Sequence, residues 1–350
     1  MSEKSETSLR GLQYPDSTNP YTRLWRESLA RQGVAFSVAS RPQDFLKFAL
    51  SPAPLDLVHL HWVHPVSRSF LLALLKFMMF QVALLFFWLR GVKIYWTVHN
   101  LVPHEKQHLW LDRLNNWLVA RFVTGVFVHG QSAIPLVSQT LSLPESRIHC
   151  AMHGNYAGVM PSVAVEDVDS DQLPGCHFLY FGLVRPYKGV LDLLGQYAAL
   201  PLPGSLTVVG DPQGAAMRQA VEAAAAGDSR IVLHLGYLEE EDLARLIHAA
   251  DVVVLPFHEV FTSGSLVMAL TMGKPVVLPR VGLLPEYVDD DCAFFYLPGK
   301  VDGLAVALCR SAACDRTVLR RMGLVAAQRA QALDWSRIAE GIARVYRGGL

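Results

Sequence analysis

The sequence has few cysteines, few charges and no net charge. Its five cysteines are odd in number and form no CxxC pair, which indicates reduced thiols in a cytosolic protein rather than a disulfide framework. Lys+Arg and Asp+Glu both number 31, so we do not expect a general nucleic-acid binder. The opening residues, MSEKSETSLRG, hold no apolar stretch of the kind a secretory signal needs. We therefore expect a cytoplasmic protein.

What the chain does have is apolar residues, at 51% of its 350 positions. That length and composition suit two α/β domains and exclude a disordered chain. The charges are unevenly spread. Residues 1–160 carry 15 Lys+Arg against 9 Asp+Glu, and the remainder carries 16 against 22. We expect only the basic first part to face an anionic surface.

One apolar segment, Phe70–Leu89, is about as long as a membrane span requires. Three interpretations are open: a true span, a fully buried helix, and a helix with one face on a bilayer. Strand-like runs on both sides, Leu55–Trp62 and Val92–Val98, would belong to one sheet, which makes the segment its crossover helix. We favour a crossover helix that dips one face into a membrane surface.

Short apolar runs alternate with helical stretches along the whole chain, which is typical of parallel βαβ layers. The acidic, proline-bounded segment 161–174 has no apolar periodicity and is expected to be a linker. Two Rossmann-like domains in series would turn the carboxyl ends of both sheets toward a central cleft.

The strongest chemical motif is FGLVRPYKG at Phe181–Gly189. Gly182 would let the backbone approach a ligand, while Arg185 and Lys188 would supply charge-assisted hydrogen bonds to the phosphate oxygens of a nucleotide. The plain alternative is a solvated loop with two surface cations.

A second motif, PFHEVFTSGS, precedes a helix. Backbone N–H groups and hydroxyls at a positive helix end form an anion site, and a glutamate on the preceding loop would accept hydrogen bonds from sugar or ribose hydroxyls. The alternative is an ordinary helix cap with a surface glutamate. The candidate residues are Glu259, Thr262, Ser263, Gly264 and Ser265.

These motifs, the run from Asp251 to Glu286 and the tail Trp335–Arg347 resemble the donor-binding domain of GT-B glycosyltransferases, the group 1 hexosyltransferases of bacteria. The resemblance implies an α/β GT-B fold whose C-terminal helix crosses back to the first domain. It also implies that Arg185 and Lys188 hold the donor pyrophosphate, and it adds Glu286 to the donor set. The expected division is 1–160 acceptor domain, 161–174 linker, 175–333 donor domain and 334–350 crossover helix.

The chain departs from the familiar pattern, which has a second glutamate as ribose ligand near the position of Met268. The TSGS variant, with the early NPY at Asn19–Tyr21, is similar to exopolysaccharide mannosyltransferases of the xanthan type. That similarity makes GDP-mannose the preferred donor.

In the first half, His99 follows a strand and resembles the histidine that contacts the donor sugar in many GT-B enzymes. Glu105 or His104 would be the general base if the reaction inverts configuration. Each histidine could also be a hydrogen-bonded structural group. The expected acceptor-side residues are Asn19, Tyr21, His61, Asn100 and His129.

Two sequence patterns match metal-binding motifs, but neither predicts a metal site here. HEKQH at His104–His108 matches a zinc-protease motif, but no glutamate follows before Glu145 to serve as a third ligand. The D-x-D within Asp167–Asp171 lies in the expected linker. We expect no metal and no cofactor, with the donor phosphates neutralised by cations and a helix dipole.

The sequence therefore predicts a membrane-associated, monotopic glycosyltransferase that moves a hexose from a nucleotide sugar to a lipid-linked saccharide in exopolysaccharide or cell-surface glycan assembly. Three alternatives stay open: a UDP-sugar enzyme of glucose or glucuronate type, a sugar-nucleotide epimerase of the same fold, and a catalytically silent scaffold. The basic residues expected to face the membrane are Arg68, Arg90, Lys93, Arg113 and Arg121.

Overall fold

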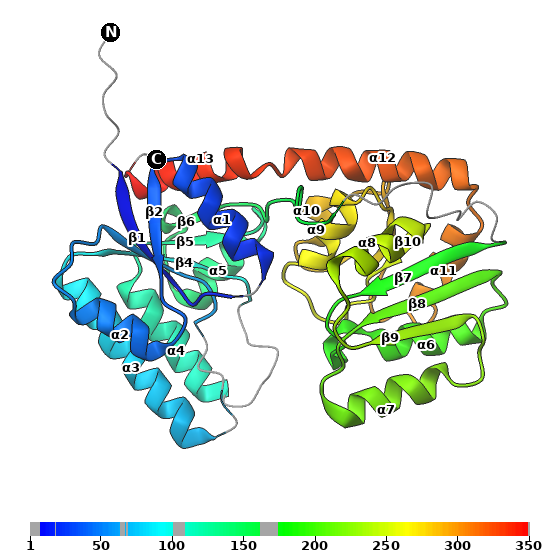
Figure 1. Cartoon of the computed structure of the whole chain (residues 1–350), viewed down its shortest axis with the longest axis horizontal. Helices are drawn as coiled ribbons and strands as arrows, with labels where there is room; N and C mark the ends of the chain where they lie inside the picture. Colours follow the sequence, from blue (N-terminus) through cyan, green and yellow to red (C-terminus); the bar gives the residue numbers. More distant parts are fainter. Residues whose placement is uncertain are drawn as a thin grey trace, which may run out of the picture. The chain divides into compact units, whose positions relative to one another are not determined.

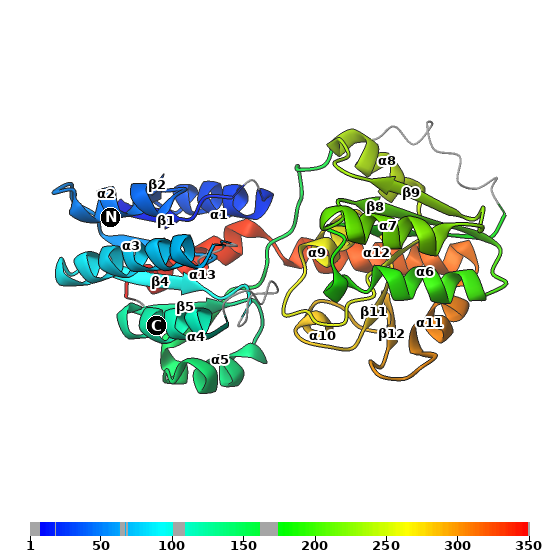
Figure 2. The same cartoon turned by 90° about the horizontal axis from the view of Figure 1, so that it is seen from below.

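The computed structural model describes residues 8–17, 19–63, 67, 69–100, 109–161 and 174–348. The chain forms two compact units (Figures 1 and 2). The first unit comprises Met1–Gly154 with Asp334–Leu350, and the second comprises Asn155–Leu333. Each contains one six-stranded parallel sheet with helices, so the predicted α/β class is confirmed. All of the expected linker except its first and last residues lies outside the described ranges.

The first sheet has the strand order β2-β1-β3-β4-β5-β6, with every pair parallel. Its strands are β1 (Leu9–Tyr14), β2 (Val34–Val38), β3 (Leu57–Leu60), β4 (Lys93–Thr97), β5 (Gly125–Val128) and β6 (Ile148–Cys150).

The helices of the first unit lie on both faces of this sheet. In Figure 1, α1 and α13 lie on one face, and α2, α3 and α4 lie on the other. The helices are α1 (Pro20–Arg31), α2 (Pro42–Leu50), α3 (Phe70–Leu89), α4 (Leu109–Phe122), α5 (Ala133–Leu141) and α13 (Trp335–Tyr346). Because α13 belongs to the first unit, the predicted return of the C-terminal helix is confirmed.

The C-terminal helix completes the core on the α1 side. Asp334 caps its start by accepting hydrogen bonds from the backbone N–H groups of Ser336 and Arg337. Its buried face, which includes Trp335 and Tyr346, packs with Trp25 of α1 and with the sheet. A Cβ on Gly154 would lie 2.3 Å from the Trp335 ring, so only glycine fits beneath that indole.

The second sheet has the order β12-β11-β10-β7-β8-β9, again parallel throughout. In Figure 1, α6 and α7 lie on one face, and α8, α9 and α12 lie on the other. Its strands are β7 (Cys176–Phe181), β8 (Gly204–Gly210), β9 (Ile231–Leu235), β10 (Val252–Val254), β11 (Val276–Pro279) and β12 (Ala293–Tyr296). The helices are α6 (Val190–Ala199), α7 (Gly214–Ala225), α8 (Glu240–Ala249), α9 (Gly264–Thr271), α10 (Leu284–Tyr287), α11 (Gly303–Ala312) and α12 (Arg316–Ala332).

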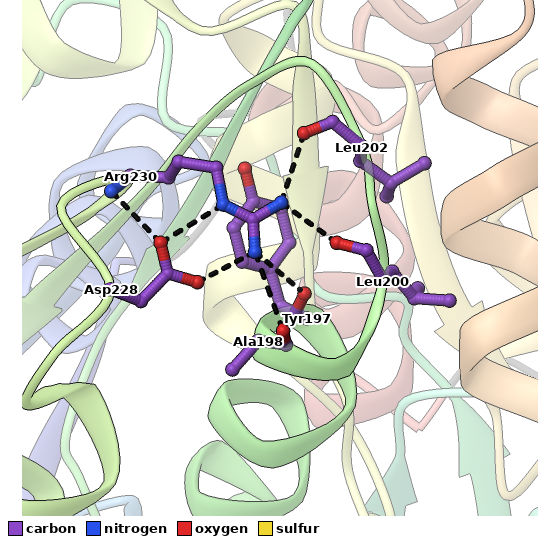
Figure 3. Close-up of polar contacts among 6 residues, drawn as sticks. All are labelled: Tyr197, Ala198, Leu200, Leu202, Asp228 and Arg230. Carbon is purple, nitrogen blue, oxygen red and sulfur yellow. Dashed lines mark hydrogen bonds and ion pairs between the residues drawn. The ribbon is translucent and has the colours of Figure 1, made fainter.

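A single arginine closes the amino edge of this sheet (Figure 3). The Arg230 guanidinium donates to the carbonyls of Leu200 at 2.7 Å and Leu202 at 3.0 Å, and it pairs with the Asp228 carboxylate at 2.6 Å. It also lies 5.0 Å from the centre of the Tyr197 ring. One side chain thus satisfies the free carbonyls after α6 and fixes the start of β9.

Candidate active site

The two glycine-containing motifs of the second unit meet at the carboxyl ends of its strands. Gly182 directly follows β7 with φ of 130°, and a Cβ placed there would lie 3.0 Å from the Ser265 hydroxyl of α9. Gly182 thus lets the end of β7 pack closely against the start of α9, while its predicted approach to a ligand stays a prediction.

Gly189 brings the second motif loop onto the first. Its φ is 71°, and a Cβ would lie 1.9 Å from the carbonyl oxygen of Pro256. The backbone N–H of His258 donates to the carbonyl of Tyr187 at 2.9 Å. The loop after β10 is therefore fastened to the turn that carries the two cations.

Lys188 lies at this edge with its ammonium packed on an aromatic ring. Its ammonium lies 4.4 Å from the centre of the buried Phe257 ring. Burial lowers the pKa of Lys188 to about 8. Within the described ranges no carboxylate pairs with it. An ammonium held over an aromatic face without a counter-ion is chemically suited to an external anion, so the donor-binding role of Lys188 stays a prediction.

The neighbouring cation is anchored at one nitrogen. Arg185 Nη1 donates to the carbonyls of Asp211 at 2.8 Å and Val184 at 3.1 Å. This holds the guanidinium at the end of β8 and leaves its other N–H groups without an acceptor among the residues that the structure describes.

The start of α9 differs in one respect from the prediction. The Ser263 hydroxyl is buried and accepts a hydrogen bond from the Leu266 backbone at 3.2 Å, so it caps the helix rather than facing a ligand. Ser265 lies beside Gly182, while the Thr262 hydroxyl is enclosed and has no hydrogen-bond partner in the described part of the chain.

The two acidic donor candidates are solvent-exposed. Glu259 lies in the loop after β10, and Glu286 lies in α10. Met268, which stands near the position of the familiar ribose glutamate, is buried in α9 and packs in the core. The sequence gives no signal for a replacement ribose ligand, and the structure shows none at Met268.

A cavity of about 320 Å³ lies beside the Phe257 ring that carries Lys188. Nε2 of His258 and a carboxylate oxygen of Asp192 are hydrogen-bonded at 2.8 Å in its wall. Phe257 lines the cavity and also carries Lys188, so the two features share one loop. Sequence reasoning missed this cavity because Asp192 and the loop after β12 lie far apart along the chain.

In the first unit, three predicted histidines line the carboxyl edge of the sheet in a row. His61, His99 and His129 follow β3, β4 and β5, which are neighbouring strands, and all three are buried. The rings of His61 and His99 are joined at 3.2 Å, as are those of His99 and His129. Burial first, and neighbouring histidines next, lower the pKa of His61 and His99 well below their usual range.

Tyr21 and Asn19 position the start of α1 against this row. Asn19 caps the helix by accepting from the Tyr21 backbone at 3.0 Å. The Tyr21 ring lies 5.0 Å from His99 and 4.8 Å from His153, measured between ring centres. The NPY motif thus contributes an aromatic ring that packs on these histidines, and His153, which was not among the predicted residues, joins the same group.

Other predicted residues contribute less to the described geometry. Asn100 follows β4 and is partly exposed. His104 and Glu105 lie outside the described residues. Asn155 donates to the carbonyl of Ala330 at 2.9 Å and therefore ties the start of the second unit to α12.

The apolar segment Phe70–Leu89 is one continuous helix, α3, long and apolar enough to cross a membrane, with a mean hydropathy of 2.3. Its inner face packs in the fold, and 33% of the stretch is buried. Gln81 donates to Asn115 of α4 at 2.8 Å, which explains the polar break in the run. Leu71 is 76% exposed and Leu75 is 49% exposed on its outer face.

The cations near this face are only partly available to a surface. Arg121 lies 4.3 Å from the ring centre of exposed Trp117 on α4. Arg90, in contrast, donates to the Ala53 carbonyl at 2.7 Å, and Lys93 donates to the Tyr346 carbonyl. Both side chains are also exposed, so their position beside a membrane stays a prediction.

Among the described residues, no group of three His, Cys, Asp or Glu side chains is placed to hold a metal ion.

Comparisons with known proteins identify the family of this chain. Residues 175–313 match the family model "Glycosyl transferases group 1". The chain is 33% identical over 269 residues to a GDP-mannose:glycolipid 4-beta-D-mannosyltransferase from Xanthomonas campestris, covering 75% of this chain and 70% of that protein. It is 34% identical over 169 residues to an MMP alpha-(1->4)-mannosyltransferase from Mycolicibacterium hassiacum, covering 46% and 40%.

Solved structures agree on the fold. A sucrose-phosphate synthase from Thermosynechococcus elongatus has a TM-score of 0.75 at 19% identity, covering 97% of this chain and 98% of that one. Anabaena HepE in complex with UDP-glucose has a TM-score of 0.72 at 15% identity, covering 97% and 100%. The chain therefore belongs to the group 1 glycosyltransferases, and it is a two-domain enzyme of the GT-B fold.

Proposed function

We propose that this glycosyltransferase moves mannose from GDP-mannose onto a lipid-linked saccharide at the cytoplasmic surface of a membrane. The observation that carries the proposal is the 33% identity over 269 residues to a protein named for GDP-mannose and a glycolipid. The anion site at Lys188, built on the Phe257 ring, supports a nucleoside diphosphate donor.

In the proposed donor site, the pyrophosphate binds where Gly182 meets Ser265 of α9. Lys188 and the free N–H groups of Arg185 supply the opposing charge, together with the positive end of α9. Glu259 accepts hydrogen bonds from donor hydroxyls. No metal or cofactor takes part, because these groups can neutralise the leaving phosphate.

In the proposed acceptor site, the carboxyl edge of the first sheet binds the saccharide, with Tyr21, His61 and His129 on the acceptor side. His99 remains our candidate for contact with the donor sugar. For a reaction that inverts the anomeric centre, a base must take the proton of the attacking hydroxyl. Glu105 and His104 remain our candidates for that base.

The outer face of α3 and the adjoining face of α4 form the proposed membrane contact, hereafter the apolar face. Its exposed members on α3 include Leu71, Leu75, Trp88 and Leu89. Arg121 over Trp117 adds a cation beside an interfacial aromatic, a combination suited to anionic headgroups.

Turnover assays test the proposal directly. The purified chain is incubated with a lipid-linked saccharide and either GDP-mannose or UDP-glucose, and the product is analysed. Mannosylated lipid is the expected product. Glucose transfer alone would instead establish the UDP-sugar enzyme, and conversion of the sugar nucleotide without transfer would establish the epimerase.

A nucleotide panel and two variants complete the test. GDP should raise the melting temperature more than UDP or ADP, whereas no response to any nucleotide would favour the scaffold. Lys188→Ala and Glu259→Ala should each lower activity, with exposed Lys47→Ala as the matched control. Full activity in both variants would show that Lys188 and Glu259 do not bind the donor.

A further inference from the structure

His61, His99 and His129, hereafter the histidine row, are linked ring to ring, and His129 at one end contacts a backbone carbonyl. That contact determines which nitrogen of each ring carries the proton. His129 Nδ1 lies 2.8 Å from the carbonyl oxygen of Ala151. A carbonyl oxygen only accepts hydrogen bonds, so Nδ1 of His129 must carry the proton. This end of the row is therefore fixed by the backbone rather than by another titratable group.

The tautomer of His129 then determines the tautomers of His99 and His61. A neutral imidazole has one N–H, and burial lowers the pKa of His129 to about 4, so its Nε2 is bare at neutral pH. That nitrogen lies 3.2 Å from His99 Nδ1, which must therefore donate. His99 Nε2 is then bare and accepts from His61 Nδ1, also at 3.2 Å.

The last nitrogen of the row has no donor. His61 Nε2 is buried and has no hydrogen-bond partner among the described residues. Its neighbours are aromatic, with the Trp25 ring 4.9 Å and the Tyr21 ring 5.8 Å away between centres. A buried bare acceptor is unfavourable until a donor reaches it.

We propose that His61, His99 and His129 form a one-way row of Nδ1–H tautomers, with His61 Nε2 as the atom that accepts a hydrogen bond from a hydroxyl. In this arrangement His99 has both nitrogens engaged, and Trp62 stacks on its ring at 4.4 Å. His129 is a positioning residue, because it sets the tautomers of His99 and His61. The hydroxyl comes from water or from the acceptor saccharide. Only the saccharide source rests on the proposed function.

The tautomers can be read by long-range ¹H–¹⁵N NMR on the full chain with ¹⁵N-labelled histidine at pH 7. In the wild type, Nδ1 should be protonated and Nε2 bare in all three rings. His129→Leu removes the acceptor that holds His99 in the Nδ1–H form, so the Nε2–H tautomer should gain population in both His99 and His61. His129→Gln places an amide oxygen near the former Nε2, so both rings should keep the Nδ1–H form.

His234→Leu is the control, since His234 is an exposed histidine of the second unit and should change neither ring. A wild-type His99 protonated at Nε2, or unchanged tautomers in His129→Leu, would overturn the row. This readout needs no turnover, so it stands even if the chain transfers a different sugar.

The source of the hydroxyl is tested on the same sample. A hydrogen-bonded ¹⁵N shift of His61 Nε2 before any ligand is added assigns the donor to water. A further shift on adding the acceptor saccharide, and none on adding GDP, assigns it to the saccharide. An unshifted Nε2 under all three conditions would overturn His61 as the accepting atom.

Discussion

The hydroxyl of Tyr346 is hydrogen-bonded to Nδ1 of His59, although 287 residues separate them. His59 lies in β3 and is fully buried, and its other ring nitrogen contacts the Thr97 hydroxyl at 2.7 Å. Both nitrogens of a buried imidazole are thereby satisfied, one of them by the C-terminal helix. The first unit is incomplete without the last residues of the chain.

Tyr346→Phe should destabilise the first unit, because it leaves a buried nitrogen of His59 without a partner while preserving the ring packing. The expected loss is about 1–3 kcal/mol of unfolding free energy, measured by urea denaturation. Tyr237→Phe is the control, since Tyr237 is 81% exposed and should be neutral. Equal stability of both variants would show that the hydrogen bond adds nothing.

Donor binding should weaken as pH rises through about 8. Burial lowers the pKa of Lys188 to about 8, so the ammonium is present below that pH and is lost above it. The dissociation constant for GDP should therefore be level from pH 6 to 7 and rise above pH 8, and calorimetry can follow it.

Lys188→Arg separates this cause from general effects of pH. A guanidinium keeps its charge throughout the range, so the rise above pH 8 should disappear even if binding is weaker overall. A profile identical to that of the wild type would assign the pH dependence to another group.

The sequence predicted most of the fold, and its failures have physical causes. The parallel sheet of the second unit was expected, because its strands are apolar runs that alternate with helical stretches. Strand β1, which lies between β2 and β3, is hard to recognise in the sequence, since Gly11 and Gln13 break its apolar pattern. Gly11 is required there because the Phe36 ring lies 2.4 Å from where a Cβ would be. α2 was likewise missed.

The sequence indicates which residues belong to the candidate site, but it does not indicate which of their side chains contact one another. Spacing placed Lys188 at a strand end, yet nothing in the sequence indicates that Phe257 lies beneath it. The same holds for His61, His99 and His129. Each follows its own strand, but their order in a row depends on the pairing of β3, β4 and β5, which a linear pattern does not encode.

Gly189→Ala should destabilise the second unit by about 2 kcal/mol or more. Its positive φ is unfavourable for alanine, and the new Cβ would meet the Pro256 carbonyl, so the loop must move. Gly195→Ala is a matched control, because Gly195 is an exposed position of α6 where a Cβ meets nothing. A gain of about 0.5–1 kcal/mol is expected there. Thermal unfolding measures both, and equal effects would contradict the close approach of the two loops.

Replacing the outermost leucines of the apolar face should weaken binding to anionic vesicles. Leu71→Glu with Leu75→Glu removes two exposed apolar side chains and adds charge repelled by the headgroups, so binding should fall at least about tenfold in a co-sedimentation assay. Leu324→Glu is the control, because that leucine is 67% exposed but lies on α12 of the second unit. If both changes weaken binding equally, or neither does, the apolar face is not the membrane contact. If only the first pair does, turnover on a soluble acceptor should stay unchanged, because these leucines are exposed on α3 whereas His61, His99 and His129 are buried.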